Sequence, residues 1–465
     1  MLRSLYSLAM TVNIDVIANE VKQSLYLVTN SKNESSLHLK IRSIFLWLIF
    51  IIVAGCNSDR ASINNFGVFD ADTNLVENIL KKYPEFFSEV LTNQNEYEVQ
   101  IIYIQINRDK NNTPSFKQYT YHLDPKNYFY SASLVKLPCS ALALEKLNEL
   151  NVKGLDKFSR MQTDSAWQCQ KIIKEDTTAE NKIPTIANYI KRMLLVSDND
   201  AYSRTYEFLG QEYINKKLSE KSYPSIRIVH RFDADCFGSA NSYTNPVSFY
   251  DANDKLVYQQ PMQHNIIKYD NPIGIVKKGV GYVDGKGNYF YQPKDMTYYN
   301  YMCLQDVNDI LRSIIFPYSV PEKQKFNLTK EDYRFLYKYM SMYPCESDYP
   351  KYDSKEYKDS YKKYFIYGTC KNKIAEDSIR IFNIVGQSYG YLSDCAYICD
   401  FKNKVEFMLS AVIYVNKDGI INDGKYDYDN IGFPFLSNLG QVIYNYERNR
   451  TKEFMPDLSD FKFEY

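Results

Sequence analysis

Segments with a β-strand pattern occur near both ends of this sequence, and helical patterns occupy the region between them. Residues 98–106 and 117–122 are rich in β-branched and aromatic side chains, and residues 380–385, 390–399 and 405–415 repeat this pattern. Because a sheet must be covered by other elements, we expect both ends to form one antiparallel sheet with a helical subdomain inserted between them. The predicted fold class is α/β in the α+β sense.

Apolar residues at helical spacing predict the helices, and turn residues predict their ends. Pro84 is expected to kink the first helix, Pro184 to open the third, and Gly154 to close the helix that begins at Ser133. A hairpin over 280–291 is expected to turn at Asp284-Gly285. The predicted helices span residues 75–91, 133–150, 184–194, 202–209, 304–315 and 435–446.

Charge and composition exclude several classes of partner. The 56 basic residues balance the 56 acidic ones, so no overall field attracts nucleic acid. The four histidines show no HExxH-like pattern, and the cysteines show no CxxC pattern. Neither a metal nor another cofactor is therefore expected. Cys345 and Cys370 are candidates for a disulfide, and most other cysteines are expected to be small buried hydrophobes.

A short apolar run near the amino end indicates export. Lys40 and Arg42 precede the apolar residues 44–54, too short to span a bilayer, and Cys56 follows directly after Gly55. This resembles a bacterial lipobox, and it predicts an exported lipoprotein held on the periplasmic or outer-membrane side by a lipid on Cys56. The alternative is a buried strand with a core cysteine. The expected organisation is an over-extended start plus signal peptide (1–56), a tether (57–72) and one domain (73–465) with an α/β part (73–130 and 376–450), a helical part (131–248) and an insertion (249–368).

Ser133 and Lys136 form an S-x-x-K pattern at the expected start of a helix. Residues three apart share one helix face, so the Lys136 amine is expected to reach the Ser133 hydroxyl. A desolvated lysine gives up its proton readily and acts as a general base. Backbone N–H groups at the helix start point toward the place where an oxyanion would develop.

Ser197, Asp198 and Asn199 follow further along the chain, on an expected helix–helix connection. A second hydroxyl and a carboxamide there would face the same cleft as Ser133. We expect Ser197 to relay a proton to the leaving nitrogen and Asn199 to hold Lys136 and the substrate amide. The competing interpretation of this triplet is a helix N-cap cluster.

S-x-x-K followed by S-D-N resembles class A β-lactamases and penicillin-binding proteins. The resemblance covers roughly residues 75–450 and includes 196–202, 208–210, 244–246 and the strand ending at Gly386. It implies the class A β-lactamase/transpeptidase-like fold and an oxyanion hole formed by the Ser133 and Gln387 N–H groups. Gly386 and Asp198 would belong to the same substrate-facing region.

The sequence departs from this family at two places. Ile384 stands where the family has the lysine that binds the substrate carboxylate, so we expect an apolar cleft wall, with Arg380 as a possible replacement cation. The Ω-loop glutamate that activates the deacylating water is also missing. Asp233 or Asp235 is a candidate for its role, and either is alternatively a partner of Arg231.

Together these features predict a serine acyl-transfer hydrolase that acts on β-lactams or related amides and esters through a Ser133 acyl-enzyme. A D-Ala-D-Ala peptidase or esterase is an alternative within the fold. A non-catalytic binding protein is favoured by Ile384, and a structural lipoprotein with coincidental motifs is a further alternative. The expected partners are a small-molecule substrate and a membrane reached through Cys56.

Overall fold

The computed structural model describes most of the chain beyond the predicted tether. The described residues are 74–167, 171–232, 238–371, 374 and 378–465. Cys56, Asp233 and Asp235 therefore lie outside the described residues.

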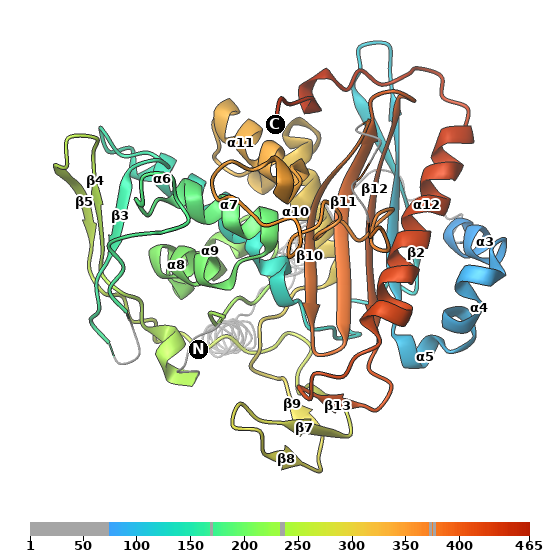
Figure 1. Cartoon of the computed structure of the whole chain (residues 1–465), viewed down its shortest axis with the longest axis horizontal. Helices are drawn as coiled ribbons and strands as arrows, with labels where there is room; N and C mark the ends of the chain where they lie inside the picture. Colours follow the sequence, from blue (N-terminus) through green and yellow to red (C-terminus); the bar gives the residue numbers. More distant parts are fainter. Residues whose placement is uncertain (1–73, 168–170, 233–237, 372–373, 375–377) are drawn as a thin grey trace, which may run out of the picture. The chain divides into compact units, whose positions relative to one another are not determined.

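A five-stranded antiparallel sheet joins the two ends of the described chain, as the sequence predicts (Figure 1). Its strand order is β10-β11-β12-β1-β2. Strand β1 pairs with the central strand β12, with Ile102 opposite Ser410, and this contact closes the sheet between segments far apart in sequence. The strands span β1 Gln100–Arg108, β2 Pro114–Tyr121, β10 Ile379–Ser388, β11 Tyr391–Asp400 and β12 Val405–Tyr414.

Strand burial follows from helices on both faces of the sheet. All ten residues of β11 and all ten of β12 are buried, whereas the edge strand β2 mixes buried and exposed positions. Figure 1 shows α12 (Phe433–Asn449), α3 (Leu75–Lys81) and α4 (Pro84–Thr92) along one face. Pro84 separates α3 from α4 because proline suits a first helical turn and disrupts a helix interior. The short α5 (Gln94–Tyr97) precedes β1.

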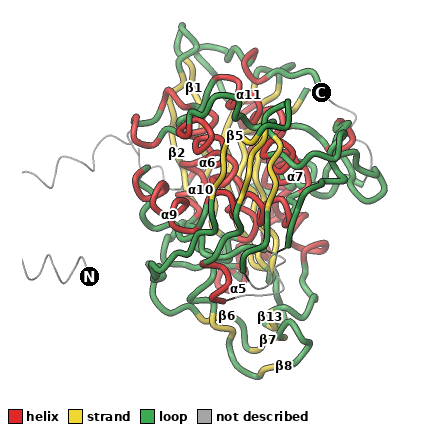
Figure 2. The backbone as a smooth tube through the Cα atoms, turned by 90° about the vertical axis from the view of Figure 1, so that its left-hand side faces the viewer, coloured by secondary structure: helices red, strands yellow, loops and turns green. Residues whose placement is uncertain are grey.

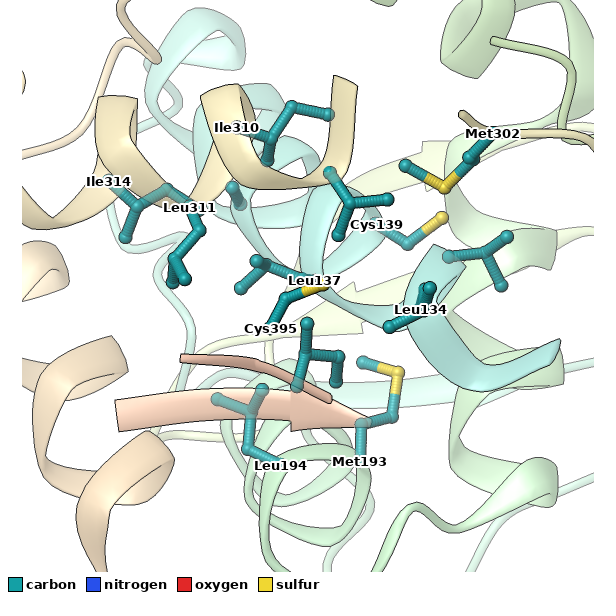
Figure 3. Packing of buried hydrophobic residues seen from close by; sticks show 14 of the residues in the cluster. Leu134, Leu137, Cys139, Met193, Leu194, Met302, Ile310, Leu311, Ile314 and Cys395 are labelled. Carbon is teal, nitrogen blue, oxygen red and sulfur yellow. The ribbon is translucent and has the colours of Figure 1, made fainter. Parts of the chain in front are cut away.

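Helices α6 (Lys136–Leu150) and α10 (Leu304–Ile315) cover the other face. Figure 3 shows Leu137 and Cys139 of α6 beside Leu311 of α10 and Cys395 of β11. Burial raises the pKa of the Cys139 and Cys395 thiols, as expected for cysteines that act as small core hydrophobes. This packing fixes the start of α6 against the sheet.

The helical part contains α7 (Ile186–Val196), α8 (Asn199–Leu209) and α9 (Gln211–Glu220). Two predicted helix ends were wrong. Helix α7 begins at Ile186 instead of Pro184. Thr185 is its N-cap residue, because the Thr185 hydroxyl accepts a hydrogen bond from Asn188 N at 3.0 Å. Asn151, in a left-handed conformation, ends α6 before Gly154 is reached.

The predicted hairpin near residue 285 is confirmed, with β7 and β8 antiparallel and β13 added from the end of the chain. Figure 2 shows these strands together with β6. Helix α11 (Lys330–Ser341) was not predicted. The remaining strands are β3 Arg160–Thr163, β4 Val247–Tyr250, β5 Leu256–Gln260, β6 Lys277–Lys278, β7 Gly281–Val283, β8 Tyr289–Phe290, β9 Lys294–Asp295 and β13 Ile420–Ile421.

Candidate active site

Ser133 lies in a 3-10 turn, Ala132–Val135, that leads directly into α6. Ala132 has a φ of 43°, a left-handed conformation that is unfavourable for a residue with a side chain. The Ser133 side chain is partly exposed, whereas Ser131 and Lys136 on either side of it are fully buried. The predicted nucleophile is thus presented at a strained turn with its base candidate beneath it.

The Lys136 amine joins the two predicted motifs. Its Nζ atom lies 2.9 Å from Ser133 Oγ and 3.1 Å from Ser197 Oγ, and it donates to Asn199 Oδ1 at 2.7 Å and to the Ser197 carbonyl. The amide and backbone oxygens only accept, so they use two N–H groups. The third bonding position of the nitrogen faces two hydroxyls, which is the geometry that a neutral amine needs to take a proton from Ser133.

Ser-Asp-Asn forms the connection between α7 and α8. Ser197 has a φ of 61° and ends α7, which turns its hydroxyl and carbonyl toward Lys136. Asn199 is the first residue of α8. The N-cap interpretation also holds, because Asp198 Oδ1 accepts a hydrogen bond from Ala201 N at 2.9 Å.

The Asp198 carboxylate is engaged in an ion pair at the connection between the two helices. Its Oδ2 accepts from Arg192 Nη2 at 2.8 Å, and Arg192 also reaches Asp176 at 3.2 Å. Among the described residues, Asp198 does not line the cavity, and no hydrogen bond joins it to Lys136. The Asp198 carboxylate therefore holds the helix connection, and its place in the substrate-facing region stays a prediction.

Gly386 on the edge strand β10 packs against the nucleophile turn. A Cβ atom there would lie 2.8 Å from Ser131 O and 2.6 Å from Ser393 Oγ, closer than side chains pack. Only glycine lets β10 approach this closely. Gln387, the next residue, lines the cavity in front of Ser133, as predicted.

Ile384 does not form the apolar cleft wall that the sequence predicted. It is 3% exposed and belongs to the core cluster between the sheet and α6. Arg380 does not replace the missing lysine, because its guanidinium donates to both carboxylate oxygens of Glu346 at 2.9 Å.

Two lysines that the sequence analysis missed lie beside β10. Lys363 Nζ is buried against Ile381 O at 2.9 Å and Asn383 Oδ1 at 2.7 Å, and burial lowers its pKa to about 7. Lys362 Nζ lies 3.3 Å from Tyr364 Oη, which donates to Gln387 Oε1 at 3.1 Å. Burial lowers the pKa of Lys362 to about 8. Lys362 is therefore linked to Gln387, which lines the cavity, by two successive hydrogen bonds through Tyr364.

Ser133 opens into a cavity of about 1190 Å³. The insertion, whose role the sequence left open, supplies much of its lining, and Asn422 joins from the turn directly after β13. Aromatic rings dominate the wall beside Ser133. Its described lining includes Tyr130, Ser133, Asn199, Arg227, His230, Phe232, Lys268, Asp270, Lys294, Tyr298, Tyr299, Gln387 and Tyr389.

His230 is a polar group of this cavity that the sequence did not single out. Its side chain is stacked beside Tyr130, and its Nδ1 lies 2.9 Å from the Arg231 carbonyl, which can only accept. The proton is therefore on Nδ1, and Nε2 carries the lone pair. Burial lowers the His230 pKa to about 4, which keeps the ring neutral near pH 7.

The loop that contains Asp233 and Asp235 is anchored at both of its described ends. Glu207 accepts from Arg231 Nη1 at 2.8 Å and from Asn245 Nδ2 at 2.9 Å. Arg231 thus has a carboxylate partner that differs from the aspartates considered in the sequence. Phe232, the last described residue before Asp233, has its ring 5.4 Å from Lys136 Nζ.

Within the described residues, no group of three or more His, Cys, Asp or Glu side chains is arranged to hold a metal ion. In the same part of the chain, no helix has the length and apolar character needed to cross a bilayer.

Comparison with known proteins gives one family match. Residues 85–269, which contain both motifs, match the model of the β-lactamase enzyme family. No curated protein matches the chain. Similar solved structures include the class A β-lactamase of Clostridium kluyveri DSM 555 (13% identity, 79% of this chain, 98% of that chain, TM-score 0.41), the β-lactamase of Streptomyces albus G (10%, 80%, 98%, 0.41) and PBP-A (13%, 80%, 96%, 0.40). The predicted family resemblance and fold class are confirmed.

Proposed function

We propose that this chain, whose residues 85–269 match the β-lactamase enzyme family, is a serine acyl-transfer hydrolase that acts on β-lactams or related amides and esters. One observation carries the proposal. Lys136 Nζ lies within hydrogen-bond distance of Ser133 Oγ, Ser197 Oγ and Asn199 Oδ1. A buried amine between two hydroxyls is suited to move a proton from the nucleophile to the leaving group.

Acylation would proceed through three proton transfers. Lys136 takes the Ser133 hydroxyl proton while Oγ bonds to the substrate carbonyl carbon, and the Ser133 and Gln387 N–H groups stabilise the oxyanion. The carbon–nitrogen or carbon–oxygen bond then breaks. Ser197 gives its proton to the leaving atom and regains one from Lys136, which leaves an ester on Ser133.

Deacylation requires a base for the incoming water. The family's glutamate is missing, and Asp233 follows directly after Phe232, whose ring lies near Lys136. We assign this role to Asp233 in preference to Asp235, since Asp233 is the residue adjacent to Phe232. Loss of the family's glutamate would make the acyl-enzyme long-lived, because general-base assistance contributes roughly 10²–10⁴-fold.

Lys362 is proposed as the group that attracts the substrate carboxylate in place of the family's lysine. Its amine is linked to Gln387 through the Tyr364 hydroxyl, with successive distances of 3.3 Å and 3.1 Å. Charge-assisted contacts of this kind contribute roughly 1.5–3 kcal/mol. This assignment replaces the expectation of an apolar cleft wall at Ile384 with Arg380 as a possible cation.

A fluorescent penicillin tests the proposed function. The wild-type chain should become covalently labelled and Ser133→Ala should not, while both keep the same circular dichroism spectrum. Absence of labelling in the folded wild-type chain would favour the non-catalytic binding protein.

The lipid anchor on Cys56 is a separate proposal, supported by the basic flank, the short apolar run and the small residues before the cysteine. Cells that express the chain should incorporate a labelled fatty acid into it, and Cys56→Ser should abolish that incorporation. Labelled lipid on the Cys56→Ser chain would contradict the lipobox interpretation.

A further inference from the structure

The insertion brings positive charge into the cavity that contains Ser133. Among the described lining residues, Arg227, Lys268 and Lys294 are cationic, and Asp270 is the acidic one. Arg227 is occupied by structural contacts, since it donates to the carbonyl of Tyr269 at 2.9 Å and to those of Thr297 and Tyr299. Lys268 is exposed. Lys294 differs from both.

Lys294 is a half-buried ammonium surrounded by aromatic rings. Its Nζ atom lies 4.6 Å from the ring centroid of Tyr282, 5.7 Å from that of Tyr299 and 6.0 Å from that of Tyr389. Lys294 is only partly exposed to water, and this burial lowers the pKa of its ammonium group. The rings compensate for only part of that lost hydration, because a cation–π contact contributes roughly 0.5–2 kcal/mol.

No carboxylate of the described residues forms an ion pair with Lys294. Asp284, the nearby acid, is engaged in its own turn, where it accepts from Lys286 N at 2.9 Å and Asn288 N at 2.8 Å. The contrast with the facing residue is direct. Lys278, opposite Lys294 on β6, binds both carboxylate oxygens of Glu98 at 2.7 Å and 2.8 Å.

Aromatic rings connect Lys294 with the nucleophile turn. The Tyr299 ring lies 5.8 Å from that of Tyr130, which precedes Ser133 by three residues, and the Tyr389 ring lies 5.1 Å from Tyr130. Tyr389 has a φ of 55° at the tip of the β10–β11 hairpin, where asparagine or glycine is usual. A tyrosine held in this unfavourable conformation at the cavity wall indicates a functional demand on its ring.

We propose that Lys294, with Tyr299 and Tyr389, forms a subsite for a carboxylate carried on the acyl part of the substrate, remote from the bond that Ser133 attacks. The rings accept the apolar body of the acyl chain, and the ammonium and phenol groups donate to its terminal carboxylate. The proposal rests on Ser133 acylation as the proposed function, and it adds the class of substrate: elongated acyl groups with an anionic end.

A series of p-nitrophenyl esters tests this subsite and measures its distance from Ser133. The probes are the mono-p-nitrophenyl esters of linear dicarboxylic acids, from glutaric to dodecanedioic acid. Each is paired with the ester whose far end is a neutral carboxamide. In the wild-type chain, one chain length should show a preference of about tenfold or more in kcat/KM for the acid, the range expected for a charge-assisted hydrogen bond.

Variants then assign that preference to one residue. Lys294→Met keeps the apolar stem against the rings and should abolish the acid preference while leaving the carboxamide ester nearly unchanged. Lys294→Arg should retain most of it. Lys268→Met removes the exposed lysine of the same cavity and should leave the preference intact.

Three results would overturn the subsite. They are equal rates for acid and carboxamide at every chain length, an acid preference that survives Lys294→Met, and an equal loss for both esters in Lys294→Met. The last would mean that Lys294 only supports the fold of the insertion.

Failure of the proposed function is distinguishable from failure of the subsite. If no ester acylates Ser133, binding of suberic acid mono-p-nitroanilide and its carboxamide to Ser133→Ala is measured by calorimetry. Tighter binding of the acid that depends on Lys294 would support the subsite without acylation. Equal binding of the two compounds would overturn it.

Discussion

The catalytic cluster and the cavity wall that faces it are organised in different ways. Ser133, Lys136, Ser197 and Asn199 come from two short motifs, and one buried nitrogen connects them. The wall is assembled from segments far apart in sequence, including β10, the insertion and the loop around Asn422. Two of its polar atoms, His230 Nε2 and Arg227 Nε, have no hydrogen-bond partner within the described part of the chain.

This difference suggests that the two regions have different roles in the proposed reaction. A fully connected polar cluster is rigid and holds reacting groups in one geometry. A wall with unsatisfied donors and acceptors is completed by what binds to it. Under the proposed function, the cluster would determine which reaction is possible and the wall would determine which acyl group is accepted.

The largest effect is expected from Lys136→Met, which removes the proton acceptor from the cluster. Acylation by a reactive β-lactam should fall by roughly 10²–10⁴-fold, the usual contribution of general-base catalysis, as measured by single-turnover kinetics. Lys146→Met is the matched control, because Lys146 is also buried on α6 but contacts Phe208 O and Gln260. An equal loss of acylation in both variants would show that it comes from disturbed packing.

The free energy of unfolding should depend on pH through His230, which belongs to the cavity wall and not to the catalytic cluster. The His230 pKa is lowered to about 4, so between pH 6.5 and 4 the unfolded chain binds a proton that the folded chain does not. The free energy of unfolding should therefore fall by about 3 kcal/mol more on acidification in the wild type than in His230→Gln. Denaturant titrations at both pH values measure this, and the exposed His264→Gln provides the control. Identical pH profiles for wild type and His230→Gln would contradict a buried neutral His230.

The smallest effect concerns Lys362. Lys362→Met should lower the acylation rate of a penicillin about tenfold relative to its methyl ester, since one charge-assisted contact is lost. Lys268→Met should leave that ratio unchanged. A wild-type chain that reacts equally with acid and methyl ester would remove Lys362 from substrate recognition.

The sequence predicted the cluster well because its geometry is local. Residues three apart on a helix must share a face, and a Ser-Asp-Asn break between two helices must expose polar groups. Gly386 was also recognisable, since the close approach of β10 to Ser131 permits only glycine. The single sheet that joins both ends of the described chain was predictable because two sets of strands had no other partner, whereas the strand order was not predicted.

The wall could not be predicted because its residues meet only through tertiary contacts. Ile384 occupies the position of a binding residue in the family but lies in the core, while Lys362 comes from the preceding segment. No spacing in the sequence connects Lys294 with Tyr389. Helix α11 was missed because charged residues and tyrosines obscure the apolar period of residues 330–341.

The central claim is that Ser133 forms an ester with the substrate, and intact mass after incubation with a penicillin tests it most directly. The wild-type chain should gain the mass of one penicillin, and peptide mapping should locate that mass on Ser133. Ser133→Ala should gain none while remaining folded. A penicillin adduct on Ser133→Ala, or an adduct mapped to another residue of the wild type, would contradict the assignment of the nucleophile.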